Sequence, residues 1–261
     1  MKATSFIEKY KEWYRLFQLP INEEEMAAWA LKEELSDEVY DYYAKLFELW
    51  ITKKQEKTTL ALKKFSRIPQ INSKTFDNFD FSKFSKNDQT AILSLKSLTF
   101  ISSHRNIIMI GPTGTGKTHL AMAIGNECIE NGIKVYFIKM DELKTKFHEA
   151  LSKNEPGSLI ESLSKVSCLI IDEVGYCKFS KAETLLFFQL ADRMSMKQTG
   201  SMILTSNKDA SLWPNLFDED DALECAIDRI WDTAMVFHFS GTSYRGTNQK
   251  TININTSNLK K

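Results

Sequence analysis

The residues best equipped for chemistry are a lysine and a threonine that follow a cluster of glycines. The pattern G-x-x-x-x-G-K-[ST] is matched by Gly111-Pro112-Thr113-Gly114-Thr115-Gly116-Lys117-Thr118. In such a loop the glycines let backbone N–H groups turn toward phosphates, the lysine reaches the β- and γ-phosphates, and the hydroxyl can ligate Mg²⁺. These eight residues therefore predict a binding site for a nucleoside triphosphate with Mg²⁺.

Two adjacent acidic residues form the second candidate group. Asp172 and Glu173 follow the apolar run 168–171, and in open α/β sheets ligands gather at the carboxyl ends of strands. We expect Asp172 to hold the Mg²⁺ that Thr118 also contacts. Glu173 is then placed to polarise an attacking water, which is the general-base step of hydrolysis.

Three more polar residues are candidates for contact with the γ-phosphate. Asn207 ends the stretch 204–207, where its amide can bond the γ-phosphate or the water, although asparagine at a strand end also forms turns. Arg229 and Arg245 can stabilise charge on the γ-phosphate. The sequence alone equally allows each arginine to be part of a surface ion pair.

The elements that must position these groups alternate between strand and helix patterns. The glycine loop lies between the apolar run 106–110 and a helical pattern over 119–127, and four further apolar runs follow at 135–138, 168–171, 202–205 and 235–239. Apolar runs bridged by helices predict a parallel five-stranded sheet covered on both faces. A helix over 88–102 should precede the first strand. Helix starts are predicted at Asp141 and at two S-x-x-E capping boxes, Ser158 to Glu161 and Ser180 to Glu183.

The chain divides into four predicted parts. Residues 1–66 contain no glycine, and their aromatic side chains recur at helical spacing, which favours the core of a helical bundle over a base-stacking surface. Residues 67–87 form a linker, whose phenylalanines Phe76, Phe79 and Phe81 should pack onto the next domain. Residues 88–245 form that α/β domain, and 246–261 form a polar tail that we expect to be disordered.

Composition narrows the remaining possibilities. The 261 residues include 34 basic and 34 acidic side chains, so overall charge does not indicate a nucleic-acid partner. The four cysteines form no C-x-x-C pair, which argues against a zinc site. The sequence has no N-terminal signal pattern and no apolar run of membrane-spanning length, so we expect a cytoplasmic protein with no membrane partner.

One segment is nevertheless basic. Between residues 53 and 86 lysine and arginine clearly outnumber acidic residues. Such a run is either a solvated face or a surface that contacts the phosphates of duplex DNA, and the sequence does not decide between the two. The DNA-contact candidates in this run are Lys53, Lys54, Lys57, Lys63, Lys64 and Arg67.

These stretches together resemble the IstB-like family, which comprises the transposition helper ATPases of bacterial insertion sequences. That family is a close relative of the DnaC helicase loaders within the AAA+ class. The resemblance extends from the N-terminal helices to residue 245. It is carried by the glycine loop with 118–121 and by residues 75–81, 169–176, 186–190, 203–207, 227–230 and 243–245.

The resemblance implies an AAA+ P-loop NTPase fold preceded by a small all-helical domain. It assigns Lys117, Thr118, Asp172, Glu173 and Asn207 to the Walker A, Walker B and sensor 1 positions. It further implies that Arg229 is an arginine finger reaching the ATP of a neighbouring subunit and that Arg245 is sensor 2. The insertion 141–165, where this clade contacts DNA, carries Lys144 and Lys146 among its lysines.

The activity implied by the resemblance is ATP hydrolysis with Mg²⁺, stimulated by DNA. The implied partners are duplex DNA, a cognate transposase and further copies of the chain. Two alternatives stay open: a DnaC-type helicase loader, and a small-molecule kinase that uses the same phosphate loop. The kinase alternative predicts an acceptor pocket and an arginine-rich lid, and the sequence indicates neither.

Overall fold

The computed structural model describes residues 3–17, 19–33, 36–197, 200–213 and 230–240. It separates into two compact units, Met1–Ala61 and Leu62–Lys261. Helix α3 (Asp37–Ser66) contributes to both, because its last turn belongs to the second unit. Across the described residues, no helix combines the length and apolarity needed to cross a membrane.

The first unit is a helical bundle with an aromatic core. Helices α1 (Ala3–Phe17) and α2 (Glu23–Glu33) pack with the N-terminal part of α3. Phe6, Tyr10 and Tyr40 are at most 1% exposed, and the Trp13 ring stacks on Phe47 with centroids 5.7 Å apart. These side chains fill the interior, which confirms the prediction of a bundle core.

The second unit is built on a five-stranded parallel sheet. Its strands are β1 (Asn106–Ile110), β2 (Val135–Lys139), β3 (Cys168–Val174), β4 (Ser201–Ser206) and β5 (Ala234–His238), in the order β2-β3-β4-β1-β5. The predicted fold class is therefore confirmed. All carboxyl ends of a parallel sheet lie at one edge, so the residues after β1, β3 and β4 meet there.

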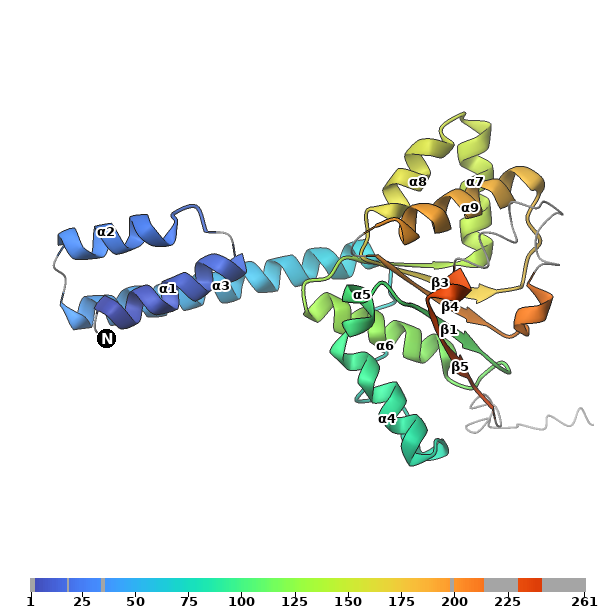
Figure 1. Cartoon of the computed structure of the whole chain (residues 1–261), viewed down its shortest axis with the longest axis horizontal. Coiled ribbons are helices and arrows are strands. Elements are labelled where there is room, and N and C mark those ends of the chain that lie inside the picture. Colours follow the sequence, from blue (N-terminus) through green and yellow to red (C-terminus); the bar gives the residue numbers. More distant parts are fainter. Residues whose placement is uncertain (1–2, 18, 34–35, 198–199, 214–229, 241–261) are drawn as a thin grey trace, which may run out of the picture. The chain divides into compact units, whose positions relative to one another are not determined.

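Helices cover both faces of this sheet (Figure 1). One face packs against α7 (Met140–Ser152), α8 (Pro156–Ser164) and α9 (Lys181–Ser195). The other packs against α4 (Lys86–Ser94), α5 (Thr99–Ser102) and α6 (Lys117–Glu130). Within the described ranges the short 3₁₀ turns are η1 (Phe81–Lys83), η2 (Leu95–Ser97) and η3 (Ala210–Leu212). Because side chains alternate along a strand, Ile107 belongs to one core cluster and Ile108 to the other.

Some helix boundaries differ from the sequence predictions. The Ser180–Glu183 capping box is confirmed, with both reciprocal hydrogen bonds present. The box predicted at Ser158 is wrong, because α8 already begins at Pro156, whose fixed φ suits a first helical turn.

Two further helix predictions, one for the start of α7 and one for the stretch before β1, are also wrong. Asp141 does not cap α7, because β2 runs directly into that helix and Lys139 takes the N-cap position. The single helix predicted over 88–102 is divided by η2 and by Leu98, whose φ of 56° lies in the left-handed region. A left-handed leucine is set by tertiary packing and has no signature in sequence.

The phenylalanine-rich segment after α3 packs along α6. Phe76 and Phe79 are about 5% exposed and belong to the core cluster that contains α6. The Asn126 amide of α6 donates to the Lys74 carbonyl at 2.7 Å, and His119 Nε2 lies 2.9 Å from the Asn78 side-chain oxygen. These contacts hold the segment against the helix that begins at the glycine loop.

Close packing at one glycine of α6 gives a stability prediction. A Cβ on Gly125 would lie 2.6 Å from Ile68 Cδ1 and 2.8 Å from Ile170 Cδ1. Gly125→Ala should therefore lower the free energy of unfolding by about 1 kcal/mol, equivalent to about 2–4 °C in a thermal melt, because overpacking outweighs the gain in helix propensity.

The matched control is Gly157→Ala in α8, where an added Cβ meets nothing within 4 Å. We expect that variant to melt at the wild-type temperature or above it. Equal melting temperatures for Gly125→Ala and the wild type would show that the two isoleucines adjust freely.

Candidate functional site

The glycine loop connects β1 to α6 and leaves the start of that helix open. Gly114 and Gly116 have φ values of 81° and 98°, which are accessible to glycine at little cost. The N-cap position of α6 is Gly116, which has no side chain to occupy the first N–H groups. These N–H groups and the helix dipole therefore favour an anion at this point.

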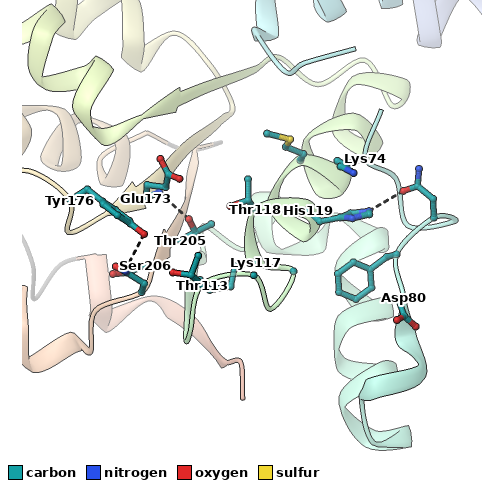
Figure 2. A pocket seen from close by; sticks show the side chains of 16 residues that line it. Lys74, Asp80, Thr113, Lys117, Thr118, His119, Glu173, Tyr176, Thr205 and Ser206 are labelled. Atoms are coloured by element: carbon teal, nitrogen blue, oxygen red, sulfur yellow. Dashed lines mark hydrogen bonds between the residues drawn. The ribbon is translucent and has the colours of Figure 1, made fainter. Parts of the chain in front are cut away.

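A cavity of about 510 Å³ lies beside the loop. Figure 2 shows Glu173 and Tyr176 on one side of the loop and Lys74, His119 and Asp80 on the other. The cavity is lined by Lys74, Asn78, Phe79, Asp80, Thr113, Gly114, Gly116, Lys117, Thr118, His119, Met122, Glu173, Tyr176, Thr205, Ser206 and Asn207. Glycine loop, strand ends and linker thus contribute to a single cavity.

Lys117 is the cation that the phosphate loop contributes to this cavity. Its side chain is largely buried, and its ammonium donates to the carbonyls of Gly111 and Pro112, both at 2.7 Å. The loop therefore fixes the ammonium beside its own backbone. A phosphate bound in the loop would compete for these N–H donors with two neutral carbonyls. The ammonium is charged in both cases, but only the phosphate adds the attraction between two opposite charges, so the phosphate is the stronger acceptor.

Asp172 is the buried acid of the site, only 1% exposed. Its Oδ1 accepts hydrogen bonds from Thr118 Oγ1 at 2.8 Å and from Thr205 Oγ1 at 2.5 Å. Burial raises the pKa of Asp172, and the two hydroxyl donors only partly oppose that effect. A carboxylate beside a hydroxyl is the oxygen-rich donor set that Mg²⁺ prefers, so Thr118 and Asp172 fit this ion directly or through water.

The raised pKa of Asp172 gives a prediction for Asp172→Asn. The folded chain binds the carboxyl proton of Asp172 more tightly than the unfolded chain does. The contribution of Asp172 to the free energy of unfolding is therefore lost as the pH rises from the ordinary pKa of 3.8 through the folded pKa. At neutral pH the nucleotide-free Asn variant should melt at a higher temperature than the wild type, since an amide oxygen still accepts from both threonines. The difference should shrink on acidification.

The same variant should lose the stabilisation that Mg²⁺-ATP gives to the wild type. Thermal melts at pH 4 and pH 7, with and without Mg²⁺-ATP, measure both effects. An Asn variant that melts below the wild type at neutral pH would contradict the cost assigned to the buried charge.

Glu173 lies in an unusual backbone position beside Asp172. Its φ is 61°, and the pairing of β3 with β4 is irregular between Ile171 and Val174. Its N–H donates to Thr205 Oγ1 at 3.1 Å. Left-handed backbone at a non-glycine residue costs about 1–3 kcal/mol and is typical of functional sites.

The Glu173 carboxylate forms an ion pair with a lysine from the neighbouring strand. Lys139 Nζ lies 2.8 Å from Glu173 Oε2, and this hydrogen bond raises the pKa of Lys139. The pair exists because β2 and β3 place Lys139 opposite Asp172. In this structure, therefore, the candidate general base is engaged by a cation.

The other γ-phosphate candidates have different outcomes. Asn207 is the first residue after β4, lines the cavity, and donates from Nδ2 to the Tyr176 hydroxyl at 3.1 Å. Arg229 and Arg245 lie outside the described residues.

The basic DNA-contact candidates are largely engaged within their own units. In the first unit Lys53 pairs with Glu56 and Lys54 donates to the Phe17 carbonyl, at 2.7 and 3.0 Å. Lys57 is exposed in the same unit.

In the second unit the basic candidates have partners on several helices, strands and loops. Lys63 pairs with Glu130, Arg67 binds Glu142 and Tyr136, and Lys144 donates to the Lys178 carbonyl. Lys64 is exposed, and Lys146 lies half-buried beside α8. The structure thus divides the basic candidates into side chains with a partner in the chain and exposed or half-buried side chains that face solvent.

Sequence reasoning missed four side chains of the site. Lys139 and Thr205 contact the two acids, Tyr176 contacts Asn207, and His119 anchors the linker. Two of them had a signal in the sequence: Lys139 is a charged residue at the end of an apolar strand, and Thr205 is a polar residue within one. Burial lowers the pKa of His119, which favours a neutral imidazole whose Nε2–H donates to the linker oxygens.

Sequence comparison finds relatives that are ATP-binding proteins of insertion sequences. A family profile described as IstB-like ATP binding protein matches residues 18–252. The insertion sequence IS5376 ATP-binding protein of Geobacillus stearothermophilus is 32% identical over 91% of this chain and 94% of its own length. The corresponding IS21 protein of Pseudomonas aeruginosa is 31% identical over 94% of this chain and 90% of its own length.

Solved structures agree on the fold. AMPPCP-bound DnaA from Aquifex aeolicus has a TM-score of 0.55 at 21% identity, covering 66% of this chain and 51% of that one. The DnaC helicase loader has a TM-score of 0.52 at 16% identity, covering 64% and 97%. With a parallel sheet of the AAA+ P-loop fold and a phosphate loop that meets the two acids at the strand ends, the chain belongs to the IstB-like ATP binding protein family and is an ATPase.

Proposed function

We propose that this ATPase assembles on duplex DNA with ATP between its subunits, directs a transposase to its target, and uses hydrolysis to reset the assembly. The observation that carries the proposal is the single cavity that gathers Lys117, Thr118, Glu173 and Asn207 around the buried Asp172. The insertion-sequence setting comes from relatives similar to it over nearly the whole chain.

In the proposed reaction a water molecule attacks the γ-phosphorus, and the bond from that phosphorus to the oxygen bridging to the β-phosphorus breaks. Glu173 accepts a proton from the water, which requires its carboxylate to leave Lys139. Lys117 and the N–H groups at the start of α6 hold the phosphates, and Asn207 donates to the γ-phosphate or the water. Bound Mg²⁺, held by Thr118 and Asp172, would neutralise charge on the β- and γ-oxygens.

The roles of the two arginines rest on the resemblance to AAA+ proteins. Arg229 acts on the ATP of a neighbouring subunit and Arg245 on the ATP of its own subunit. Residues 88–245, with the segment 67–87 packed onto them, then form the ATPase domain, and 1–66 serve assembly and DNA contact through their basic residues. A catalytic arginine supplied by another subunit makes hydrolysis depend on assembly.

The proposal is tested by measuring ATP hydrolysis with and without duplex DNA, alongside sedimentation. With ATP and Mg²⁺, duplex DNA should increase both turnover and the size of the sedimenting species. Rising salt should weaken DNA binding steeply, and sequence preference should be slight, because several phosphates are neutralised. Lone protomers that ignore DNA while saturated with Mg²⁺-ATP would refute the assembly.

Two comparisons refine the test. Arg229→Ala should retain ATP binding and lose assembly and turnover, with Arg193→Ala, an exposed arginine of α9, as control. Addition of purified transposase or purified replicative helicase then distinguishes the transposition helper from a helicase loader. The DnaC likeness is one of fold, whereas relatives above 30% identity are insertion-sequence proteins.

A further inference from the structure

The carboxyl ends of β3 and β4 are hydrogen-bonded to each other next to the ATP cavity. Ser206 Oγ donates to the Val174 carbonyl at 2.6 Å and accepts from the Lys208 N–H at 3.0 Å. Gly175 has a φ of 112°, and a Cβ there would lie 2.6 Å from Lys208 Cγ. This close approach fixes the backbone that carries the residues following each strand.

Those following residues are Tyr176 and Asn207, and they bind each other. Asn207 Nδ2 donates to the Tyr176 hydroxyl at 3.1 Å, and both side chains line the cavity. Figure 2 shows Tyr176 on the same side of the phosphate loop as Glu173. The tyrosine is 56% exposed. Its ring therefore contributes little to the core, and among the residues that the structure describes its hydroxyl is hydrogen-bonded to the asparagine.

We propose that Tyr176 is a positioning residue for ATP hydrolysis, acting by holding the Asn207 amide. The inference rests on the proposed contact between Asn207 and the γ-phosphate or the attacking water. An amide nitrogen carries two N–H groups, so one can bind the tyrosine while the second serves the anionic phosphate. Without the hydroxyl the amide can rotate and present its oxygen, which an anion repels.

The test compares Tyr176→Phe, Asn207→Ala and the double variant in steady-state ATP hydrolysis. Tyr176→Phe should lower kcat about 3- to 10-fold with KM for ATP nearly unchanged, the effect of one hydrogen bond that matters in the transition state. Asn207→Ala should lower kcat further. In the Asn207→Ala background, Tyr176→Phe should have no additional effect, because the group it positions is gone.

Tyr42→Phe is the matched control, since Tyr42 is an exposed tyrosine of α3 in the other unit. Thermal melts without nucleotide should be the same for all variants.

Three results would overturn the inference. Tyr176→Phe could hydrolyse ATP as fast as the Tyr42→Phe control. It could also slow Asn207→Ala by the same factor as it slows the wild type, which would make its role independent of the asparagine. A wild-type rate for Asn207→Ala would overturn the role of Asn207 and the inference together, whereas a slow Asn207→Ala with a normal Tyr176→Phe overturns the inference alone.

Discussion

Lys117→Ala should weaken ATP binding by at least about 100-fold, since two charge-assisted hydrogen bonds to phosphate are worth about 1.5–3 kcal/mol each. The ammonium is buried in the loop and already hydrogen-bonded to the Gly111 and Pro112 carbonyls. No other lysine lines the cavity on the phosphate-loop side among the residues that the structure describes, because Lys74 belongs to the linker side. Titration calorimetry with ATP measures the loss directly.

The control for this variant is Lys96→Ala, an exposed lysine of η2. Melting curves without nucleotide separate a binding defect from a folding defect, because removing Lys117 also leaves two loop carbonyls without their donor. An alanine variant that binds ATP with wild-type affinity would show that backbone N–H groups alone hold the phosphates.

Glu173→Gln should slow ATP hydrolysis by about 10²- to 10⁴-fold, which is the usual contribution of a general base. The amide has nearly the shape of the carboxylate and can still accept from Lys139, so the site should keep its geometry. Affinity for ATP should change little, because the lost proton transfer occurs only in the transition state. Single-turnover hydrolysis and equilibrium ATP binding together measure the two quantities.

Glu161→Gln gives a matched control for this second variant. Glu161 also pairs with a lysine, Lys165 at 2.9 Å, but it lies on the surface of α8. Its hydrolysis rate should equal that of the wild type. If Glu173→Gln retained a normal rate while binding ATP normally, another group would have to accept the proton.

The sequence allowed the fold and the centre of the site to be predicted because both depend on local patterns. Apolar runs identified all five strands, and the glycine loop with its following helix placed Lys117 and Thr118. The meeting of Thr118 with Asp172, 54 positions apart, follows from the rule that carboxyl ends of parallel strands share one edge.

The contacts that the sequence did not reveal depend on register and packing. The pair of Lys139 with Glu173 requires β2 and β3 to align Lys139 with Asp172, and register has no local signature. The left-handed conformation of Leu98 likewise depends on neighbours that are distant in the chain. The start of α8 at Pro156 was missed because the sequence offers two plausible starts, the proline and the later capping-box serine.

The packing of residues 68–79 against α6 determines where related proteins can be recombined. Ile68, Phe76 and Phe79 are part of the ATPase core. His119, which immediately follows Thr118, hydrogen-bonds the same segment. A chimaera that exchanges N-terminal helices between relatives should therefore cross over before residue 62. A junction placed in the region that looks like a linker would import foreign side chains into the wall of the ATP cavity.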